Sequence, residues 1–160
     1  MFDTDFITGE HKRTLDDRFR LALPPEFVQR VTNLQGEAVI IKERHGCLSL
    51  WRPAEWQERF AQRLELIKQK IKMGLLDPRH PDLQRFGRLI STRSMSVSFA
   101  NRSRLLVPEG FREFLDVPAG QEVMVVGAAI CVEVWQPVAW REALKDQLPL
   151  FDGLMQGIIS

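Results

Sequence analysis

The alternation of apolar and polar positions predicts short strands around one short helix near the start of the chain. Residues 14–23 alternate on either side of a charged interruption, which indicates two short strands joined by a tight turn. Two prolines end the second strand, and the latter of them opens a short helix over 25–31. A β-branched run at 38–41 and a returning apolar run at 47–51 predict two more strands. The predicted unit is therefore strand, strand, helix, strand, strand.

A longer helix follows this unit, beginning at Pro53 and ending near Gly74. Its apolar residues are spaced by three or four positions and form one stripe: Trp56, Phe60, Leu64, Ile67 and Ile71. Aromatic stripes also line cofactor sites, but packing on the strands of the same unit is the favoured interpretation.

The chain contains this pattern twice, with an offset of 84 residues. Residues 18–58 align with 102–142 without a gap, and twelve positions are identical. They are Arg18/Arg102, Arg20/Arg104, Leu21/Leu105, Pro24/Pro108, Phe27/Phe111, Gly36/Gly120, Val39/Val123, Cys47/Cys131, Trp51/Trp135, Pro53/Pro137, Trp56/Trp140 and Glu58/Glu142. Each copy is too small to enclose a large core alone, so we expect the copies to pack together. A shorter last helix should start at Pro137, and the apolar, glycine-broken tail over 150–160 either docks on a neighbour or frays.

Composition places the chain among ordinary folded proteins. The 160 residues suit one domain or two small ones that share a core, with 44% hydrophobic and 27% charged residues. No apolar run approaches a membrane span, and residues 1–10 carry three acids and no basic residue, unlike a secretory leader. We expect a cytoplasmic protein without a membrane partner.

Charge is unevenly distributed although the net charge is only +1. Residues 79–104 contain six arginines and one acid, whereas residues 105–160 contain three basic and eight acidic side chains. The basic segment suits either nucleic acid or the acidic segment of another copy.

The repeated turn carries the best candidates for binding, because it places arginines together on a projecting loop. The basic candidates for contact with nucleic acid are Lys12, Arg13, Arg18, Arg20, Arg102 and Arg104. In the alternative interpretation, one arginine of each turn forms an internal ion pair, for instance Asp16 with Arg20, and the rest only solvate the loop.

Enzyme chemistry has little support in the sequence. Cys47 and Cys131 have no CxxC partner, so two buried free thiols are expected rather than a redox or metal pair. Histidines do not couple with Cys or Ser residues, and a glycine-rich phosphate loop is absent from the sequence. We expect no enzyme activity, no cofactor, no metal and no small-molecule substrate.

The turn and its surroundings resemble the MraZ family of bacterial transcriptional regulators. The resemblance rests on Gly9-Glu10-His11, on the run from Leu15 to Phe27, and on Arg104-Leu105-Leu106-Val107-Pro108 in the second copy. It implies an α+β fold of two AbrB-like swapped-hairpin repeats that form one pseudo-twofold barrel, each repeat followed by a helix. It also implies that Asp16 and Arg20 in the first copy, and Arg104 in the second, contribute to a DNA-binding loop.

Domain boundaries follow from the repeat and the resemblance. We expect a first DNA-binding repeat over 9–54, an amphipathic helix and basic connector over 55–92, a second DNA-binding repeat over 93–138, and a C-terminal helix and tail over 139–160.

Two departures from the family pattern lie in the loops. Ala100 stands where the family has Asp, and the family's usual Gly before the arginine is Phe19 in one copy and Ser103 in the other. If that Gly has a positive φ angle, Phe19 is strained or bends the loop differently. Its ring either touches DNA or tucks against protein, and burial is the favoured interpretation.

The resemblance therefore implies a sequence-specific regulator that binds double-stranded DNA at promoter repeats of the division and cell-wall gene cluster. The expected assembly is a homo-oligomer, shaped as a ring, associated with the nucleoid. The alternative is an oligomeric scaffold or interaction protein with the same fold that has lost specific DNA recognition.

Overall fold

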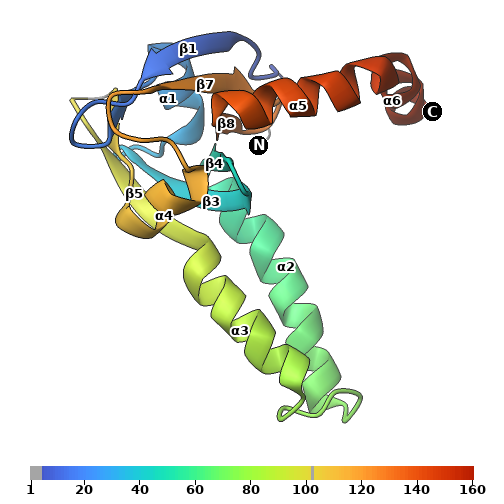
Figure 1. The fold of residues 1–160 in the computed structure, drawn as a ribbon. Helices are drawn as coiled ribbons and strands as arrows, with labels where there is room; N and C mark the ends of the chain where they lie inside the picture. The colour runs from blue at the N-terminus through green and yellow to red at the C-terminus, as the bar shows by residue number, and fades with distance from the viewer. Residues whose placement is uncertain (1–4, 102) are drawn as a thin grey trace.

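Pairs of strands from the two copies alternate around a nearly closed antiparallel barrel (Figure 1). The structure, a computed structural model, describes residues 5–101 and 103–160. Its strands are β1 (Glu10–Thr14), β2 (Arg20–Ala22), β3 (Glu37–Arg44), β4 (Cys47–Trp51), β5 (Ser94–Ala100), β6 (Arg104–Leu106), β7 (Glu122–Gly127) and β8 (Val132–Trp135). Their order around the barrel is β1-β7-β8-β4-β3-β5-β6-β2, and the turn between β1 and β2 joins the two ends. These strands agree with the sequence pattern in both copies.

Strand pairing joins the two copies into one barrel. β1 of the first copy pairs with β7 of the second, β5 of the second pairs with β3 of the first, and β4 lies beside β8. β2 pairs with β6, which also pairs with β5 of its own copy; we call the β2–β6 pair the ribbon. Each copy thus satisfies backbone hydrogen bonds of the other, as the swapped-hairpin prediction requires.

A pseudo-twofold axis relates the copies, and the strand register locates it. Leu21 lies directly opposite Leu105 in the ribbon, and Ser49 lies opposite Glu133 in the β4–β8 pair. Both pairs join positions 84 residues apart, so the axis passes through the ribbon and leaves through the β4–β8 pair.

The barrel interior is filled by equivalent residues of both copies. Helices α1 (Pro25–Val31) and α4 (Glu109–Leu115) insert Phe27 and Phe111, which are 2% and 4% exposed, against the buried Leu21 and Leu105. Truncating such a residue to Ala costs about 2–5 kcal/mol of stability. The shared core fixes the ribbon rigidly on the barrel.

Two helical arms leave the barrel in different directions (Figure 1). The first is a hairpin of α2 (Pro53–Lys72) and α3 (Pro81–Arg93); the second consists of α5 (Pro137–Gln147), a 3-10 turn η1 (Leu148–Leu150) and α6 (Phe151–Ile159). None of the described helices combines the length and apolar composition that a membrane crossing requires.

The hairpin differs from the sequence prediction in two ways. The segment expected as a basic connector contains helix α3, whose N-terminus is capped by His80 accepting a hydrogen bond from the Asp82 N–H. The stripe of α2 was predicted to pack on the strands, but only its first residue does so: Trp56 lies 5.8 Å from the ring of Trp51. Farther along, Phe60 and Ile67 face α3, because the helix points away from the barrel.

Candidate nucleic-acid interface

The Asp16 carboxylate organises the first loop. Its Oδ1 accepts hydrogen bonds from the backbone N–H of Arg18 (2.9 Å) and of Arg20 (2.8 Å), and its Oδ2 accepts one from Arg20 Nε (2.8 Å). The backbone hydrogen bond from Arg20, assisted by the other two, lowers the pKa of Asp16. The carboxylate therefore stays ionised near neutrality and holds Arg20 by its Nε. The ion pair between Asp16 and Arg20 that the alternative interpretation expected is present. Both Nη groups of Arg20 remain without a hydrogen bond to the described residues.

Phe19 tucks against protein, as the favoured interpretation expected. Its φ angle is +60°, in the left-handed region that glycine adopts without strain. Its half-buried ring packs on the core, with the Arg112 guanidinium 4.5 Å from the ring centre. Arg112 in turn donates from Nε to the Val107 carbonyl (2.6 Å), and the Val107 N–H donates to the Phe19 carbonyl (3.0 Å). The second copy thereby anchors the first loop.

The ribbon brings both repeated arginines to one surface. Leu21 and Leu105 face the core, so the alternate positions face outward. Arg20 lies opposite Leu106, and Arg104 lies opposite Ala22, which makes the two arginines diagonal neighbours. Diagonal positions of this kind are roughly 7–8 Å apart, within reach of long side chains. We call the outward side of Arg20, Ala22, Arg104 and Leu106 the ribbon face.

The second loop is built differently. Its positive φ falls on Asn101 (+52°) rather than on Ser103, the equivalent of Phe19, and the Ser103 N–H donates to the Ala100 carbonyl (3.2 Å). Ala100 supplies no carboxylate, and exposed Arg104 makes no ion pair with the described residues. Arg102 lies outside the described residues.

Lys12 and Arg13 sit beside the ribbon rather than on it. They are consecutive in β1, so their side chains leave opposite sides of that strand. Lys12 pairs with Glu122 on β7 at 3.8 Å, an exposed contact of little energetic weight. Arg13 bonds the Lys12 carbonyl through Nη1 (3.0 Å).

Support residues of the ribbon face were not evident from the sequence. Ala22 and Leu106 have no distinctive sequence signal, and only the β2–β6 register shows that each lies directly opposite one of the two arginines. Arg112 carried no motif signal, since its contact with Phe19 joins different copies.

Buried polar groups mark the other end of the pseudo-twofold axis. The indole N–H of Trp51 donates to Ser49 Oγ (2.8 Å), and that of Trp135 donates to Glu133 Oε1 (3.0 Å), the same contact in each copy. Ser49 also donates to Glu43. Burial, together with the nearby charge of Glu43, raises the pKa of Glu133. These hydrogen bonds hold the tryptophans on the sheet.

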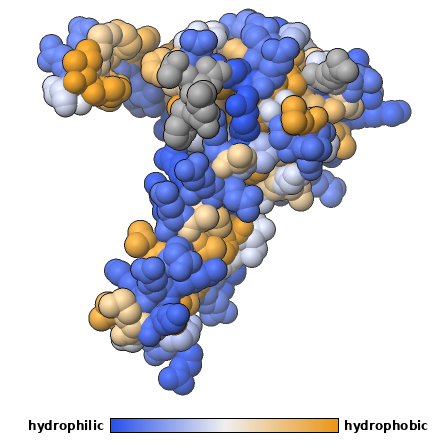
Figure 2. Space-filling model, turned by 180° about the vertical axis from the view of Figure 1, so that it is seen from behind, coloured by the Kyte–Doolittle hydropathy of each residue, from blue (hydrophilic) through white to orange (hydrophobic). Residues whose placement is uncertain are grey.

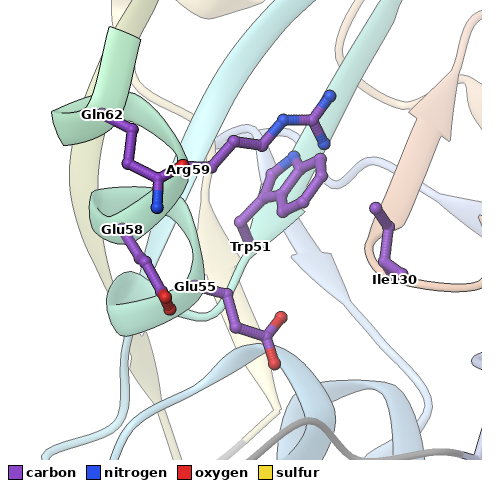
Figure 3. A pocket seen from close by; sticks show the side chains of 6 residues that line it. All are labelled: Trp51, Glu55, Glu58, Arg59, Gln62 and Ile130. Atoms are coloured by element: carbon purple, nitrogen blue, oxygen red, sulfur yellow. The ribbon is translucent and has the colours of Figure 1, made fainter. Parts of the chain in front are cut away.

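The recess in Figure 3 offers no catalytic arrangement. It has a volume of about 440 Å³ and lies between α2 and the loop that carries Ile130. Arg59 covers the Trp51 ring at 5.3 Å, and Glu55 and Glu58 belong to the same helix. Within residues 5–101 and 103–160, no group of three His, Cys, Asp or Glu side chains is placed to hold a metal ion.

The cysteines are free and buried, as predicted from their apolar surroundings. Burial raises the pKa of Cys131 to about 12 and raises that of Cys47 as well. Both thiols therefore stay protonated near neutrality and are poor nucleophiles.

Comparison with known proteins agrees with the duplicated architecture. The family model described as "MraZ protein, putative antitoxin-like" matches residues 6–75 and 95–155, one match for each copy. The chain belongs to the MraZ family. A relative named transcriptional regulator MraZ from Neisseria meningitidis is 30% identical over 142 residues, covering 88% of this chain and 86% of its own. Relatives of the same name from Pediococcus pentosaceus (24%) and Moorella thermoacetica (26%) each cover 95% of this chain and 96% of their own.

Membership supports a role as a transcriptional regulator, and MraZ is a family of regulators rather than of enzymes. The unmatched residues 76–94 include all of α3, so the second helix of the hairpin lies outside the part that the family model matches.

Proposed function

We propose that this regulator binds duplex DNA sequence-specifically through the ribbon face and its two flanking loops. The observation that carries the proposal is the register of β2 against β6, which places Arg20 and Arg104 side by side on a rigid, exposed ribbon. In the DNA major groove, arginine recognises guanine by a bidentate pair of hydrogen bonds.

The loops add contacts to the phosphate backbone. Arg18 is exposed on the first loop, and Arg102 occupies the same sequence position in the second. Asp16 orients Arg20 before DNA arrives, which reduces the entropy lost on binding. Lys12 and Arg13 flank the ribbon and suit outer phosphates. Arg104 has no carboxylate to orient its side chain, so the second loop should bind DNA more weakly than the first.

A single ribbon face carries few charges, so we propose that several copies act together. A homo-oligomeric ring would display many ribbon faces to repeated promoter sites, and linked sites gain affinity without new contacts. The proposed targets are promoter repeats of the division and cell-wall gene cluster, which places the protein in the cytoplasm at the nucleoid.

Titration of the protein with DNA from upstream of its own gene tests this proposal. Arg18→Ala combined with Arg20→Ala should weaken specific binding by about 1–3 kcal/mol per base-contacting arginine and flatten the salt dependence by roughly one unit per lost phosphate contact. Arg141→Ala combined with Lys145→Ala removes two exposed charges from α5 and is the matched control. Equal binding by both double variants would reject the ribbon face as the reading surface, and absence of any sequence-dependent shift would favour the scaffold alternative.

A further inference from the structure

One large apolar side chain is exposed on the ribbon face, beside the two arginines. Leu106 is 52% exposed in β6, whereas most exposed large hydrophobic residues of the described chain belong to the helical arms. Figure 2 shows hydrophobic surface on these arms, including the end of the arm that points to the left. Within the strands of residues 5–101 and 103–160, Leu106 and Met95 are the exposed large hydrophobic residues. Isolated residues of this kind are common on protein surfaces, but Leu106 lies where the proposed reading surface is.

The strand register brings Leu106 close to Arg20. The two residues lie directly opposite each other in the ribbon, on its outward side. The next pair along the strands is hydrogen-bonded, because the Val107 N–H donates to the Phe19 carbonyl (3.0 Å). Arg20 and Leu106 therefore form a non-hydrogen-bonded pair, in which the Cα atoms are about 4.5 Å apart and the side chains approach most closely.

This spacing suits two neighbouring base pairs, which are about 3.4 Å apart along a DNA strand. When Arg20 contacts guanine, the Leu106 side chain meets an adjacent base edge. Leucine neither donates nor accepts a hydrogen bond, so covering a polar base edge with it costs free energy. The thymine 5-methyl group is the apolar group among the base edges of the major groove.

We propose that Leu106 contacts the 5-methyl group of a thymine next to the guanine that Arg20 recognises. This inference rests on the proposed function, since it requires the ribbon face to lie in the major groove. The second copy thereby adds a specificity-determining residue to the arginine of the first copy. In the pseudo-symmetric pair, Arg104 lies opposite Ala22, whose side chain is a single methyl group with a shorter reach. Thymine recognition should therefore be stronger beside Arg20 than beside Arg104.

Replacing thymine by uracil in the DNA isolates this contact, because it removes the methyl group and keeps every hydrogen-bonding group. Duplex DNA from upstream of the gene is prepared with thymine or with uracil at all thymine positions, and each form is titrated with the full-length protein. The wild type should bind the uracil form at least about fourfold more weakly, which is the cost of leaving one methyl group uncovered. Leu106→Ser should bind both forms with equal affinity.

Two further variants serve as controls. Leu106→Met keeps an apolar side chain of similar volume and should retain the preference for thymine. Met95→Ser is the matched control, because Met95 is 49% exposed in β5, which meets β6 only at Phe99 and Ala100. This variant should keep the full preference of the wild type. Circular dichroism verifies folding, and Leu106→Ala takes the place of Leu106→Ser if the serine variant folds poorly.

The outcomes separate this inference from the proposed function. Sequence-dependent binding by the wild type with equal affinity for the thymine and uracil forms would overturn the thymine contact alone. A preference for thymine that Leu106→Ser retains would also overturn it, because the methyl group would then act through another residue or through DNA shape. Absence of any sequence-dependent binding would reject the ribbon face as the reading surface, and this inference with it.

Discussion

Because the backbone at Phe19 is left-handed, we expect Phe19→Gly to be more stable than Phe19→Ala, which reverses the usual order of glycine and alanine. Phe19→Ala and Phe19→Gly both remove the ring that packs on Arg112 and on the core. They differ in the backbone, because φ is +60° at this position. Alanine keeps the strain of that conformation, whereas glycine relieves it.

The magnitude follows from the contacts. Full burial of a phenylalanine ring is worth about 3–5 kcal/mol, so the half-buried Phe19 ring accounts for roughly 2 kcal/mol. The contact with the guanidinium adds about 1 kcal/mol. Phe19→Ala should therefore lower the free energy of unfolding by about 3 kcal/mol. Glycine relieves about 1–2 kcal/mol of left-handed strain, but its greater freedom in the unfolded chain costs about 0.5–1 kcal/mol. Phe19→Gly should therefore be roughly 1 kcal/mol more stable than Phe19→Ala.

Chemical denaturation of both variants measures this difference. Phe114 is the matched control, because it is also half-buried against the same core but lies in helix α4. There the usual order holds, and Phe114→Gly should be about 0.5–1 kcal/mol less stable than Phe114→Ala. A Phe19→Ala variant as stable as Phe19→Gly, or more stable, would refute the left-handed assignment and the role of strain in this loop.

Three further predictions concern other parts of the fold. Gly127→Ala should destabilise the barrel, since an added Cβ would lie 2.6 Å from neighbouring backbone, whereas Gly87→Ala, in the open on α3, should stabilise by about 0.5–1 kcal/mol; thermal unfolding compares them. Glu133→Gln should be more stable than the wild type at about pH 8 and should lose this advantage toward about pH 4. The reason is that a carboxyl group with a raised pKa binds more protons in the folded state, so the wild type loses stability as the pH rises. Denaturation across this pH range would show a constant difference between the two proteins if the reasoning failed. Iodoacetamide should label Cys47 and Cys131 only after unfolding, and mass spectrometry that finds either labelled in the native protein would contradict their burial.

Local sequence signals were sufficient for the barrel and insufficient for the site. Alternation and proline positions located β1 to β4 and their second-copy equivalents, because each strand has one side in the core. Helix α3 was missed although Leu83, Phe86 and Ile90 have helical spacing, since the prolines and arginines around it indicated a connector.

The ribbon face could not have been predicted from local signals. Arg20 and Arg104 are far apart in sequence, and they meet only because Leu21 pairs with Leu105. Register between strands is decided by the core they share, and a slip of one residue in either strand would have turned the arginine of that strand inward. Likewise, the contact between Phe19 and Arg112 depends on how the copies pack.

The most direct test of the account compares single arginine variants at the two ends of the ribbon face. Binding of upstream DNA by Arg20→Ala and by Arg104→Ala is measured at two salt concentrations beside Arg141→Ala. The account predicts weaker binding and a flatter salt dependence for both ribbon variants, with the larger loss for Arg20→Ala because Asp16 orients that side chain. Binding by either ribbon variant that equals the Arg141→Ala control would contradict the claim that the pseudo-twofold pair forms one DNA-reading surface.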